Sequence, residues 1–273
     1  MNETRTIELA SRPLEDSALL SFPQFDNIDG FAHAFTTRPW NMSPHRGPDN
    51  HLAVERRRRV CEHLGLPFAN LTAPDQIHSP HVLRVGPSDV GAGREGRDTA
   101  IQFVDGLVCD LPDVPIMQFS ADCPLILAVD PRRRIFGTAH ASWRGTVAHI
   151  AMELVEQLSA NFKVRPHDLL VGIGPCAGPG EYEVGEVVRR IALARLPGAT
   201  RFFHAKGDPG APGCFDLRAA NVAQLLDAGI RPDHIAVAAP STMTDPRFFS
   251  HRRDGPDTGR FALIAGFRSE PRP

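Results

Sequence analysis

The sequence predicts an α+β protein, in which a single domain forms an α/β sandwich of mixed β-sheets flanked by helices. Short apolar runs typical of strands are interspersed irregularly with amphipathic helix patterns, without the even alternation of a doubly wound parallel sheet. The chain has 273 residues and 42% hydrophobic content, enough to bury a substantial core, and no repeat or low-complexity tract divides it. We expect residues 1–30 to form an N-terminal extension packed on the domain that residues 31–273 build.

The first half of that domain predicts a strand, a helix and a loop. FAHAFTT at 31–37 is typical of a strand, and LAVERRRRVCEHLG at 52–65 of an amphipathic helix that ends at Gly65. We expect its arginine run to form a solvated helix face. GPSDVGAGREGRD at 86–98 is Gly-rich and charged, which predicts a mobile surface loop.

The centre of the chain predicts three adjacent strands followed by a helix. The strands are the apolar runs at 115–122, 125–130 and 135–141, separated by Cys-Pro and by an arginine-rich turn. The helix is expected over 146–162, with Thr146 as its N-cap. Its apolar stripe, at helical spacing, comprises Val147, Ile150, Ala151, Leu154, Val155 and Leu158.

The remaining segments predict further strands and helices, with Asp216 as the N-cap of one helix. Strands are expected at 169–175, 201–205, 234–239 and 260–267, helices at 183–195 and 217–229, and loops at 207–213 and 241–259.

Composition excludes several classes of protein. A net charge of -2 and a pI near 6.6 disfavour nucleic acid as a partner. The N-terminus lacks the apolar run of a signal peptide, and no window approaches the roughly 20 apolar residues of a membrane span. Five cysteines without a CxxC pair favour a reducing compartment, so we expect a cytoplasmic protein with no membrane partner.

Three predicted strand ends carry side chains that could bind a metal: His78, Cys123 and His140. Two imidazoles and a thiolate would leave the fourth position of zinc open, as in catalytic sites, and such a metal activates water. Spacing alone is weak support, because a single cysteine on an apolar strand is commonly a buried hydrophobe and a single histidine is commonly hydrogen-bonded.

Arginines near these strand ends predict an anion pocket. Arg144 in HASWRG lies where a strand gives way to a helix, beside His140 and the free amides of the helix start. Arg38, Arg252 and Arg253 are further candidates, although in an arginine-rich chain most such residues are solvated or paired on the surface. We expect Trp143 to pack at the helix entry, with base stacking as the alternative.

These segments resemble the YfiH, or laccase-domain, family. The resemblance is carried by DGLVCDLPDVPIMQFSADCPLILAVDPRRRIFGTAHASWRGTVAHI in the centre. Further similar pieces, in the family's order from about residue 31 onward, lie at 36–47, 76–82, 173–188, 215–230 and 248–260.

The resemblance implies a YfiH-like metal-dependent catalytic domain with zinc on His78, Cys123 and His140, copper being the alternative ion. It implies a cytoplasmic enzyme that phosphorolyses purine nucleosides such as adenosine, inosine and methylthioadenosine, with adenosine deamination in several members. Its small-molecule partners are then a purine nucleoside and phosphate. The chain departs from the family's usual residues at Ser142, Gly180, Glu181, Ser241 and His251.

For phosphorolysis we expect Arg144, and secondarily Arg38, to position the phosphate through bidentate contacts. Asn41 and His45, in the segment 36–47 that resembles the family, are further candidates for substrate or phosphate binding. For deamination, Asp122 or His45 would act as the acid/base group beside a metal-activated water.

Three alternatives remain open at this point. A copper-dependent polyphenol oxidase fits poorly, because no HxH pair occurs in the sequence. A thiol hydrolase would use Cys123 as nucleophile, with His140 or His78 as base. A scaffold module would leave the metal-capable set without a role. The preferred nucleoside, the native metal and the oligomeric state are left open.

Overall fold

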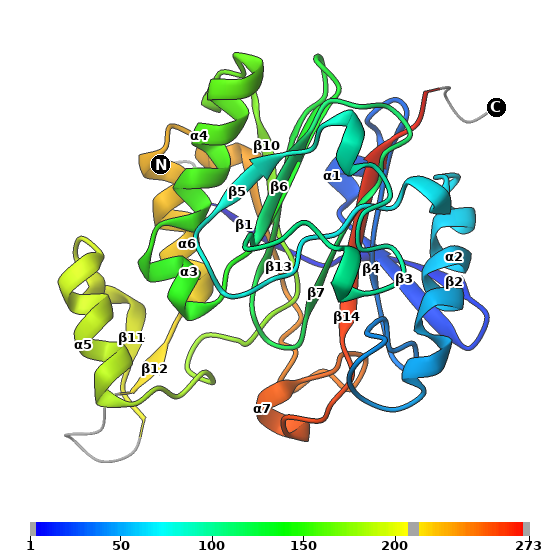
Figure 1. Ribbon diagram of the computed structural model, residues 1–273. Coiled ribbons are helices and arrows are strands. Elements are labelled where there is room, and N and C mark those ends of the chain that lie inside the picture. The colour runs from blue at the N-terminus through cyan, green and yellow to red at the C-terminus, as the bar shows by residue number, and fades with distance from the viewer. Residues whose placement is uncertain (1–3, 207–212, 270–273) are drawn as a thin grey trace.

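The computed structural model describes residues 4–206 and 213–269, which form four layers (Figure 1). A seven-stranded and a five-stranded sheet pack face to face, with the helices α4 (Ile150–Phe162) and α6 (Leu217–Asp227) outside the first and α2 (Ala53–Leu64) outside the second. The predicted α+β sandwich flanked by helices is confirmed.

The larger sheet is mixed, with β1, β13 and β10 parallel, β8 and β9 antiparallel to their neighbours, and β6 parallel to β5. Its strands, in spatial order, are β1 (Arg5–Ile7), β13 (Ile235–Ala238), β10 (Leu170–Ile173), β8 (Leu125–Asp130), β9 (Ile135–His140), β6 (Gly106–Cys109) and β5 (Val82–Arg84).

The smaller sheet is antiparallel throughout. Its strands, in spatial order, are β2 (Ala10–Leu14), β3 (Ser17–Ser21), β4 (Phe31–Thr36), β14 (Phe261–Phe267) and β7 (Ile116–Ser120). A separate two-stranded pair consists of β11 (Phe203–His204) and β12 (Cys214–Phe215).

Four further α-helices and seven short 3-10 helices complete the described residues. The α-helices are α1 (Pro23–Asp26), α3 (Trp143–Val147), α5 (Glu186–Arg195) and α7 (His251–Asp254). The 3-10 helices are η1 (Asn50–Leu52), η2 (Phe68–Asn70), η3 (Pro87–Asp89), η4 (Arg97–Thr99), η5 (Pro166–Asp168), η6 (Ala199–Phe202) and η7 (Pro232–His234).

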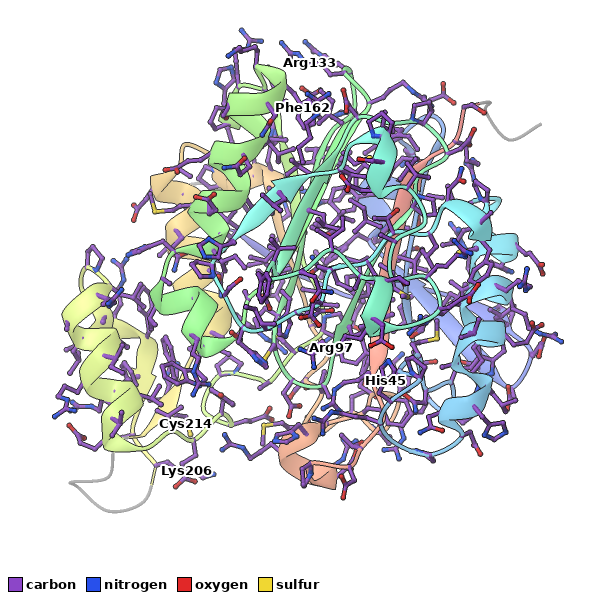
Figure 2. The ribbon with its side chains drawn as sticks, viewed as in Figure 1. His45, Arg97, Arg133, Phe162, Lys206 and Cys214 are labelled. Carbon is purple, nitrogen blue, oxygen red and sulfur yellow. The ribbon has the colours of Figure 1, made fainter. Side chains whose placement is uncertain are left out.

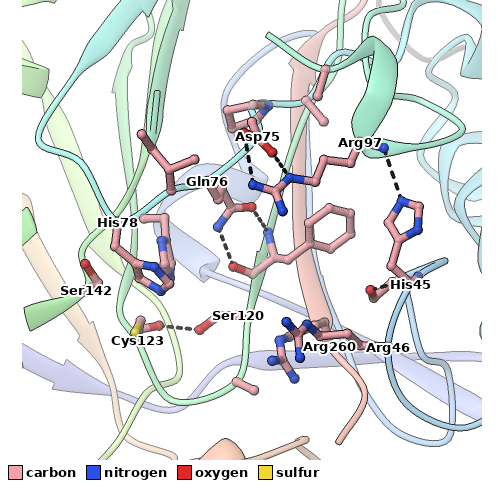
Figure 3. Close-up of a pocket in the computed structure, with 18 of the residues that line it drawn as sticks. His45, Arg46, Asp75, Gln76, His78, Arg97, Ser120, Cys123, Ser142 and Arg260 are labelled. Carbon is pink, nitrogen blue, oxygen red and sulfur yellow. Dashed lines mark hydrogen bonds and ion pairs between the residues drawn. The ribbon is translucent and has the colours of Figure 1, made fainter. Parts of the chain in front are cut away.

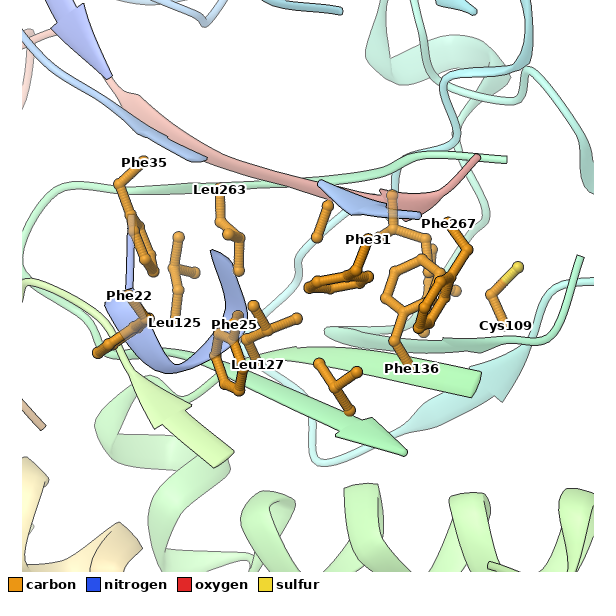
Figure 4. Packing of buried hydrophobic residues seen from close by; sticks show 14 of the residues in the cluster. Phe22, Phe25, Phe31, Phe35, Cys109, Leu125, Leu127, Phe136, Leu263 and Phe267 are labelled. Carbon is orange, nitrogen blue, oxygen red and sulfur yellow. The ribbon is translucent and has the colours of Figure 1, made fainter. Parts of the chain in front are cut away.

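Alternation of side chains along the strands explains the two-sheet core. Leu125 and Leu127 of β8 point into the space between the sheets, where they meet Leu263 of β14 and a cluster of phenylalanines (Figure 4). The intervening Ile126 packs under α4, and Ile264 of β14 packs under α2. Both sheets are therefore buried on both faces, which is why their strands are continuous apolar runs.

The predicted helix at 52–65 is confirmed, and Gly65 ends it with a left-handed conformation at φ 65°. The expectation of a wholly solvated arginine face is wrong at Arg57, which is 1% exposed. Its guanidinium donates to the backbone oxygens of Met42, Gly93 and Arg94, which compensate for its burial.

The same contacts hold the predicted loop at 86–98 against the domain. Arg57 binds two of its carbonyl groups, Gly91 N donates to Thr72 Oγ1 at 3.0 Å, and Ala73 N donates to Ala92 O at 2.8 Å. The segment 86–98, which contains η3, is therefore fixed to the domain by these hydrogen bonds.

The central strands form, but not as three neighbours in one sheet. β8 pairs with β9, whereas β7 pairs with β14 in the opposite sheet. The chain crosses between the sheets at residues 121–124, and this crossing carries Cys123.

The predicted central helix is split in two. Ser142, rather than Thr146, is the N-cap, because its hydroxyl accepts from Gly145 N at 3.2 Å. The helix breaks at His149, whose φ is 65°, and resumes as α4. The predicted apolar stripe is buried along its whole length.

The later elements agree with the sequence apart from their ends. Asp216 caps α6 by accepting from Ala219 N at 2.9 Å, as predicted. The predicted strand at 201–205 is shortened to β11, because η6 occupies its beginning. Most of the predicted loop at 207–213 lies outside the described residues, and the segment 241–259 contains α7.

Residues 5–21 supply β1, β2 and β3, which are strands of the two sheets themselves. A boundary at residue 30 stays a prediction. No helix in the part of the chain that the structure describes is both long and apolar enough to cross a membrane.

Candidate active site

A pocket of about 1050 Å³ opens at one end of the sandwich, where β7 and β9 end and β14 begins (Figure 3). Both sheets and the loops 43–46, 73–78 and 93–100 contribute to its wall. Figure 2 places His45 and Arg97 together at this pocket, far from Arg133. Seven of the ten residues that the sequence analysis assigned to catalysis, metal or anion binding line it: His45, His78, Asp122, Cys123, His140, Arg144 and Arg252.

His78 lies in a loop whose backbone is held in an unusual conformation. Both Gln76 and His78 have positive φ, 53° and 66°, a region that non-glycine residues rarely adopt. The Gln76 amide fixes the loop to β7, because it donates to Phe119 O and accepts from Phe119 N, both at 2.8 Å. The imidazole of His78 remains exposed to the pocket.

Cys123 follows a second strained residue, Asp122, whose φ is 102°. Ser120 Oγ donates to Cys123 O at 2.6 Å, and Ala177 N donates to Asp122 O at 2.9 Å. These bonds form a tight turn between the sheets, and Cys123 is the one partly exposed cysteine among the five.

His140 is the last residue of β9, and its side chain is buried. Its ring lies beside that of His78, with centroids 5.3 Å apart and planes inclined by 56°. Its Nδ1 bonds to Asp105 Oδ1 at 2.9 Å. Asp105 also accepts from the backbone amides of His78 at 3.0 Å and Ser79 at 2.7 Å.

Electrostatics differ between the two histidines. Partial burial, and next the proximity of His140, lower the pKa of His78 to about 4, so its ring is neutral at pH 7. Burial alone would lower the pKa of His140, but the Cys123 sulfur and the Asp105 carboxylate outweigh burial and raise it to about 9. Burial alone would raise the pKa of Asp105, but the hydrogen bond and charge of His140 and the bonds from the two backbone amides outweigh burial and lower it.

In the part of the chain that the structure describes, no group of three or more His, Cys, Asp or Glu side chains is arranged so that it could hold a metal ion as it stands. The donor types nevertheless fit zinc. Two imidazoles bound to one tetrahedral ion at about 2.0–2.1 Å would place their ring centroids roughly 5 Å apart. The His78 and His140 rings have this separation. Cys123 lines the same pocket, and Figure 3 shows it close to His78.

Besides the buried Arg57, four guanidinium groups line the pocket without forming an ion pair with any carboxylate among the described residues: Arg46, Arg144, Arg252 and Arg260. Among the described residues, the side chains of Arg46 and Arg144 have no hydrogen-bonded protein partner. The guanidinium carbon of Arg144 lies 4.4 Å from the centroid of the Trp143 ring. Arg252 and Arg260 donate only to backbone carbonyls. Burial, then repulsion from Arg46, lowers the pKa of Arg260. This concentration of positive charge is suited to an anion.

The helix start beside Arg144 contributes less than the sequence suggested. The amides of Gly145 and Thr146 are already bound by the side chain and carbonyl of Ser142. The guanidinium groups, rather than free helix amides, therefore provide the anion contacts.

Arg38 and Asn41 do not line the pocket. Arg38 pairs with Asp254 at 3.1 Å and lies over the Phe249 ring. Asn41 is fully buried and donates to the backbone oxygens of Arg46 and Pro48. Both have structural partners that shape the loops, and a role for either in binding phosphate stays a prediction.

Asp122 and His45 lie on the pocket wall with partners of their own. Asp122 accepts from Thr242 Oγ1 and from Arg252 N, both at 2.7 Å, so both its oxygens are engaged. His45 Nε2 accepts from Arg97 N at 3.2 Å. This geometry favours a positioning role for Asp122, and its acid/base role stays a prediction. Arg253, a further candidate, donates to backbone oxygens and to Asp254.

Sequence reasoning missed several residues of the site, among them Arg46, Asp105, Tyr182 and Arg260. Arg46 and Arg260 lie in segments that resembled the family, so their positive charge was a usable signal. Asp105 is the first residue of the central run that resembles the family, but its role was not recognisable because it arises from contacts across more than 20 positions of sequence.

Four departures from the family pattern have clear local roles. Ser142 caps α3, and Glu181 contacts Ser241 while accepting from Gly178 N at 2.8 Å. His251 begins α7 and lines the pocket. Glu181 and Ser241 therefore form one local contact.

The fold and the pocket define a two-sheet sandwich protein with a histidine–cysteine centre and an arginine-rich wall. The family described as "Multi-copper polyphenol oxidoreductase laccase" matches residues 29–268, so the chain belongs to this laccase-domain, or YfiH, family.

Curated relatives and solved structures agree with this assignment. The chain is 37% identical over 231 residues to "Purine nucleoside phosphorylase YlmD" of Geobacillus stearothermophilus, covering 84% of each chain. It is 32% identical over 244 residues to a "Purine nucleoside phosphorylase" of Deinococcus radiodurans, covering 86% of this chain and 88% of the relative.

The crystal structure of the Geobacillus YlmD matches with a TM-score of 0.83 at 33% identity, over 95% of this chain and 99% of that one. The Bacillus licheniformis hypothetical protein YfiH matches with a TM-score of 0.85 at 27% identity, over 94% and 99%.

Proposed function

We propose that this protein is a purine nucleoside phosphorylase that binds its nucleoside and phosphate in the pocket between His78 and Arg260. The observation that carries the proposal is the pairing, in one pocket, of a histidine–cysteine centre with guanidinium groups that have no carboxylate partner. The names of the relatives support the same activity.

We further propose that zinc is held by His78, Cys123 and His140, with copper as the alternative ion. The separation of the two rings and the bond from Asp105 support this assignment, because a carboxylate commonly binds the second nitrogen of a metal-ligating histidine. When bound, zinc supplies Lewis acidity toward a polar group of the substrate.

The arginines would hold and aim the phosphate. In phosphorolysis a phosphate oxygen forms a bond to the anomeric carbon while the bond from that carbon to the purine nitrogen breaks, and its electron pair leaves with the base. Arg144 and Arg260, as charged donors of fixed geometry, would neutralise the phosphate and direct one oxygen toward the sugar.

The departing base carries negative charge and needs a hydrogen-bond donor or a proton. Tyr182 lines the pocket, and burial raises its pKa to about 12, so its hydroxyl stays protonated at neutral pH. It is suited to donate to the base. Trp143, on the same wall, offers a ring against which a purine can stack.

Adenosine deamination is a second outcome at the same site, and the geometry ranks it below phosphorolysis. Zinc deaminases require a carboxylic acid/base group beside the attacking water. Among the described residues, three carboxylates line the pocket: Asp75, Asp98 and Asp122. Asp75 pairs with Arg97, and both oxygens of Asp122 accept hydrogen bonds. Only Asp98 or a histidine would then be available to move the proton.

A nucleoside screen tests the proposal. Metal-analysed protein is incubated anaerobically with adenosine, inosine and methylthioadenosine, with and without phosphate, and the products are identified by mass spectrometry. We expect release of free base that requires phosphate and does not require oxygen. Copper-dependent oxygen uptake with phenols, and no base release, would identify an oxidase instead.

A further inference from the structure

Asp105 is a buried carboxylate that contacts both histidines of the pocket. It has no exposed surface and lies directly before β6. Its Oδ1 accepts from His140 Nδ1 at 2.9 Å and from His78 N at 3.0 Å. Its Oδ2 accepts from Ser79 N at 2.7 Å and from Ser79 Oγ at 3.1 Å. Every bond to this carboxylate therefore comes from His140 or from the loop at residues 78–79.

The backbone of Asp105 is fixed just as tightly. Its carbonyl oxygen accepts from His140 N at 2.7 Å and from Gln118 Nε2 at 3.1 Å. Gln118 comes from the opposite sheet, is fully buried, and also donates to Thr138 O. Asp105 is thus held by both sheets, and its carboxylate has little freedom to move.

The bonds of Asp105 determine which nitrogen of His140 is free. An ionised carboxylate only accepts, so the proton that it binds must be on Nδ1, which leaves Nε2 as the nitrogen available to the pocket. The bond from His78 N to Asp105 stabilises the left-handed backbone conformation of His78, which is unfavourable for a residue other than glycine.

The geometry points to Asp105 as the positioning residue of the site, a single carboxylate that sets both the ring of His140 and the backbone of His78 and thereby the spacing of the two imidazoles. This inference rests on the proposed function, because that function places a ligand between the two rings. Asp105 itself does not contact the ligand.

The substitution Asp105→Asn tests this role. Asparagine has nearly the same shape, but it replaces one acceptor oxygen with an NH₂ group that meets either an amide N–H or the protonated Nδ1. We expect zinc affinity, measured by competition with a chromophoric chelator, to fall 10- to 100-fold, about the effect of losing such an outer contact.

Asp130→Asn is the matched control. Asp130 is also fully buried and accepts from Arg132 N and Arg133 N, both at 3.0 Å, but it lies at the opposite end of β8 from Leu125. We expect this variant to keep zinc affinity within twofold of the wild type. An equal loss in both variants would show a general effect of losing a buried carboxylate and would overturn the inference.

A second measurement needs no variant and so remains decisive if Asp105→Asn does not fold. In nitrogen-15 NMR of the metal-free wild-type protein, we expect His140 to carry a proton on Nδ1 that exchanges slowly with water. A His140 ring with a bare Nδ1, or wild-type zinc affinity in Asp105→Asn, would overturn the inference. Asp105-dependent zinc binding without phosphate-dependent base release would contradict only the proposed function.

Discussion

Asn41 accepts a hydrogen bond from Arg260 N at 2.9 Å, although the two residues lie 219 positions apart. The same Oδ1 accepts from Ser43 N at 3.0 Å, and the amide group donates to two carbonyls of the loop that carries Arg46. Asn41 thus joins the two segments that bring Arg46 and Arg260 to the pocket, side by side in Figure 3.

Replacing Asn41 should therefore affect stability first. We expect Asn41→Ala to lower the free energy of unfolding in urea by roughly 3 kcal/mol, because several buried partners lose their bonds. Asn161→Ala, at a half-buried helix position with partners only in its own helix, should cost much less. If the variant kept wild-type stability but lost phosphate binding, Asn41 would be a ligand contact after all.

Arg144 should contribute mainly to phosphate binding. We expect Arg144→Gln to raise the KM for phosphate by about 10- to 100-fold, the equivalent of a charged hydrogen bond, with a smaller change in the KM for nucleoside. Arg84→Gln is the control, since Arg84 does not line the pocket and also lies over an aromatic ring, that of Phe162, which Figure 2 shows far from His45 and Arg97. A phosphate KM that is equal in both variants would remove Arg144 from the anion site.

Cys123 distinguishes a metal ligand from a nucleophile. The other four cysteines are buried, so alkylation of the folded protein reports mainly on Cys123. We expect iodoacetamide to label it in metal-free protein and zinc to slow the labelling at least tenfold, because a ligand thiolate is unavailable. Equally fast labelling with and without zinc would favour the thiol hydrolase alternative.

Stability should fall on mild acidification because of His33. This side chain is buried, its Nε2 accepts from Phe22 N at 2.8 Å, and burial lowers its pKa to about 3. Between pH 6.5 and 3 the unfolded chain binds a proton that the folded chain does not, so this contribution is complete above pH 6.5 and is lost as the pH falls.

The expected size of this effect, between pH 7.5 and pH 5, is about 2 kcal/mol of unfolding free energy. Urea denaturation at the two pH values measures it, and His33→Gln, which keeps an acceptor for Phe22 N, should lose correspondingly less. A variant with the full wild-type loss would assign the pH dependence to other groups.

The sequence predicted the sandwich because burial imposes a pattern on each strand. Ile126 and Ile264 alternate with neighbours that face the other way, and both runs were recognisable as strands, whereas the short buried strand β6 was not predicted. Which strands are neighbours was not recognisable, because β7 joins β14 through contacts between distant parts of the chain.

The site was predictable only in its chemical groups. His78, Cys123 and His140 were identified as donors, but the backbone conformations that present them, positive φ at Gln76 and Asp122, leave no pattern in sequence. Arg57 looked like a surface residue, because the carbonyls that solvate it come from loops elsewhere in the chain.

The most direct test of the phosphorylase proposal is phosphorus-31 NMR of zinc-loaded protein with adenosine and inorganic phosphate. The proposal predicts a new sugar 1-phosphate resonance that grows in equal amount with free adenine and is abolished in Cys123→Ser. Conversion of adenosine to adenine without that ester, or to inosine with phosphate unchanged, would contradict it.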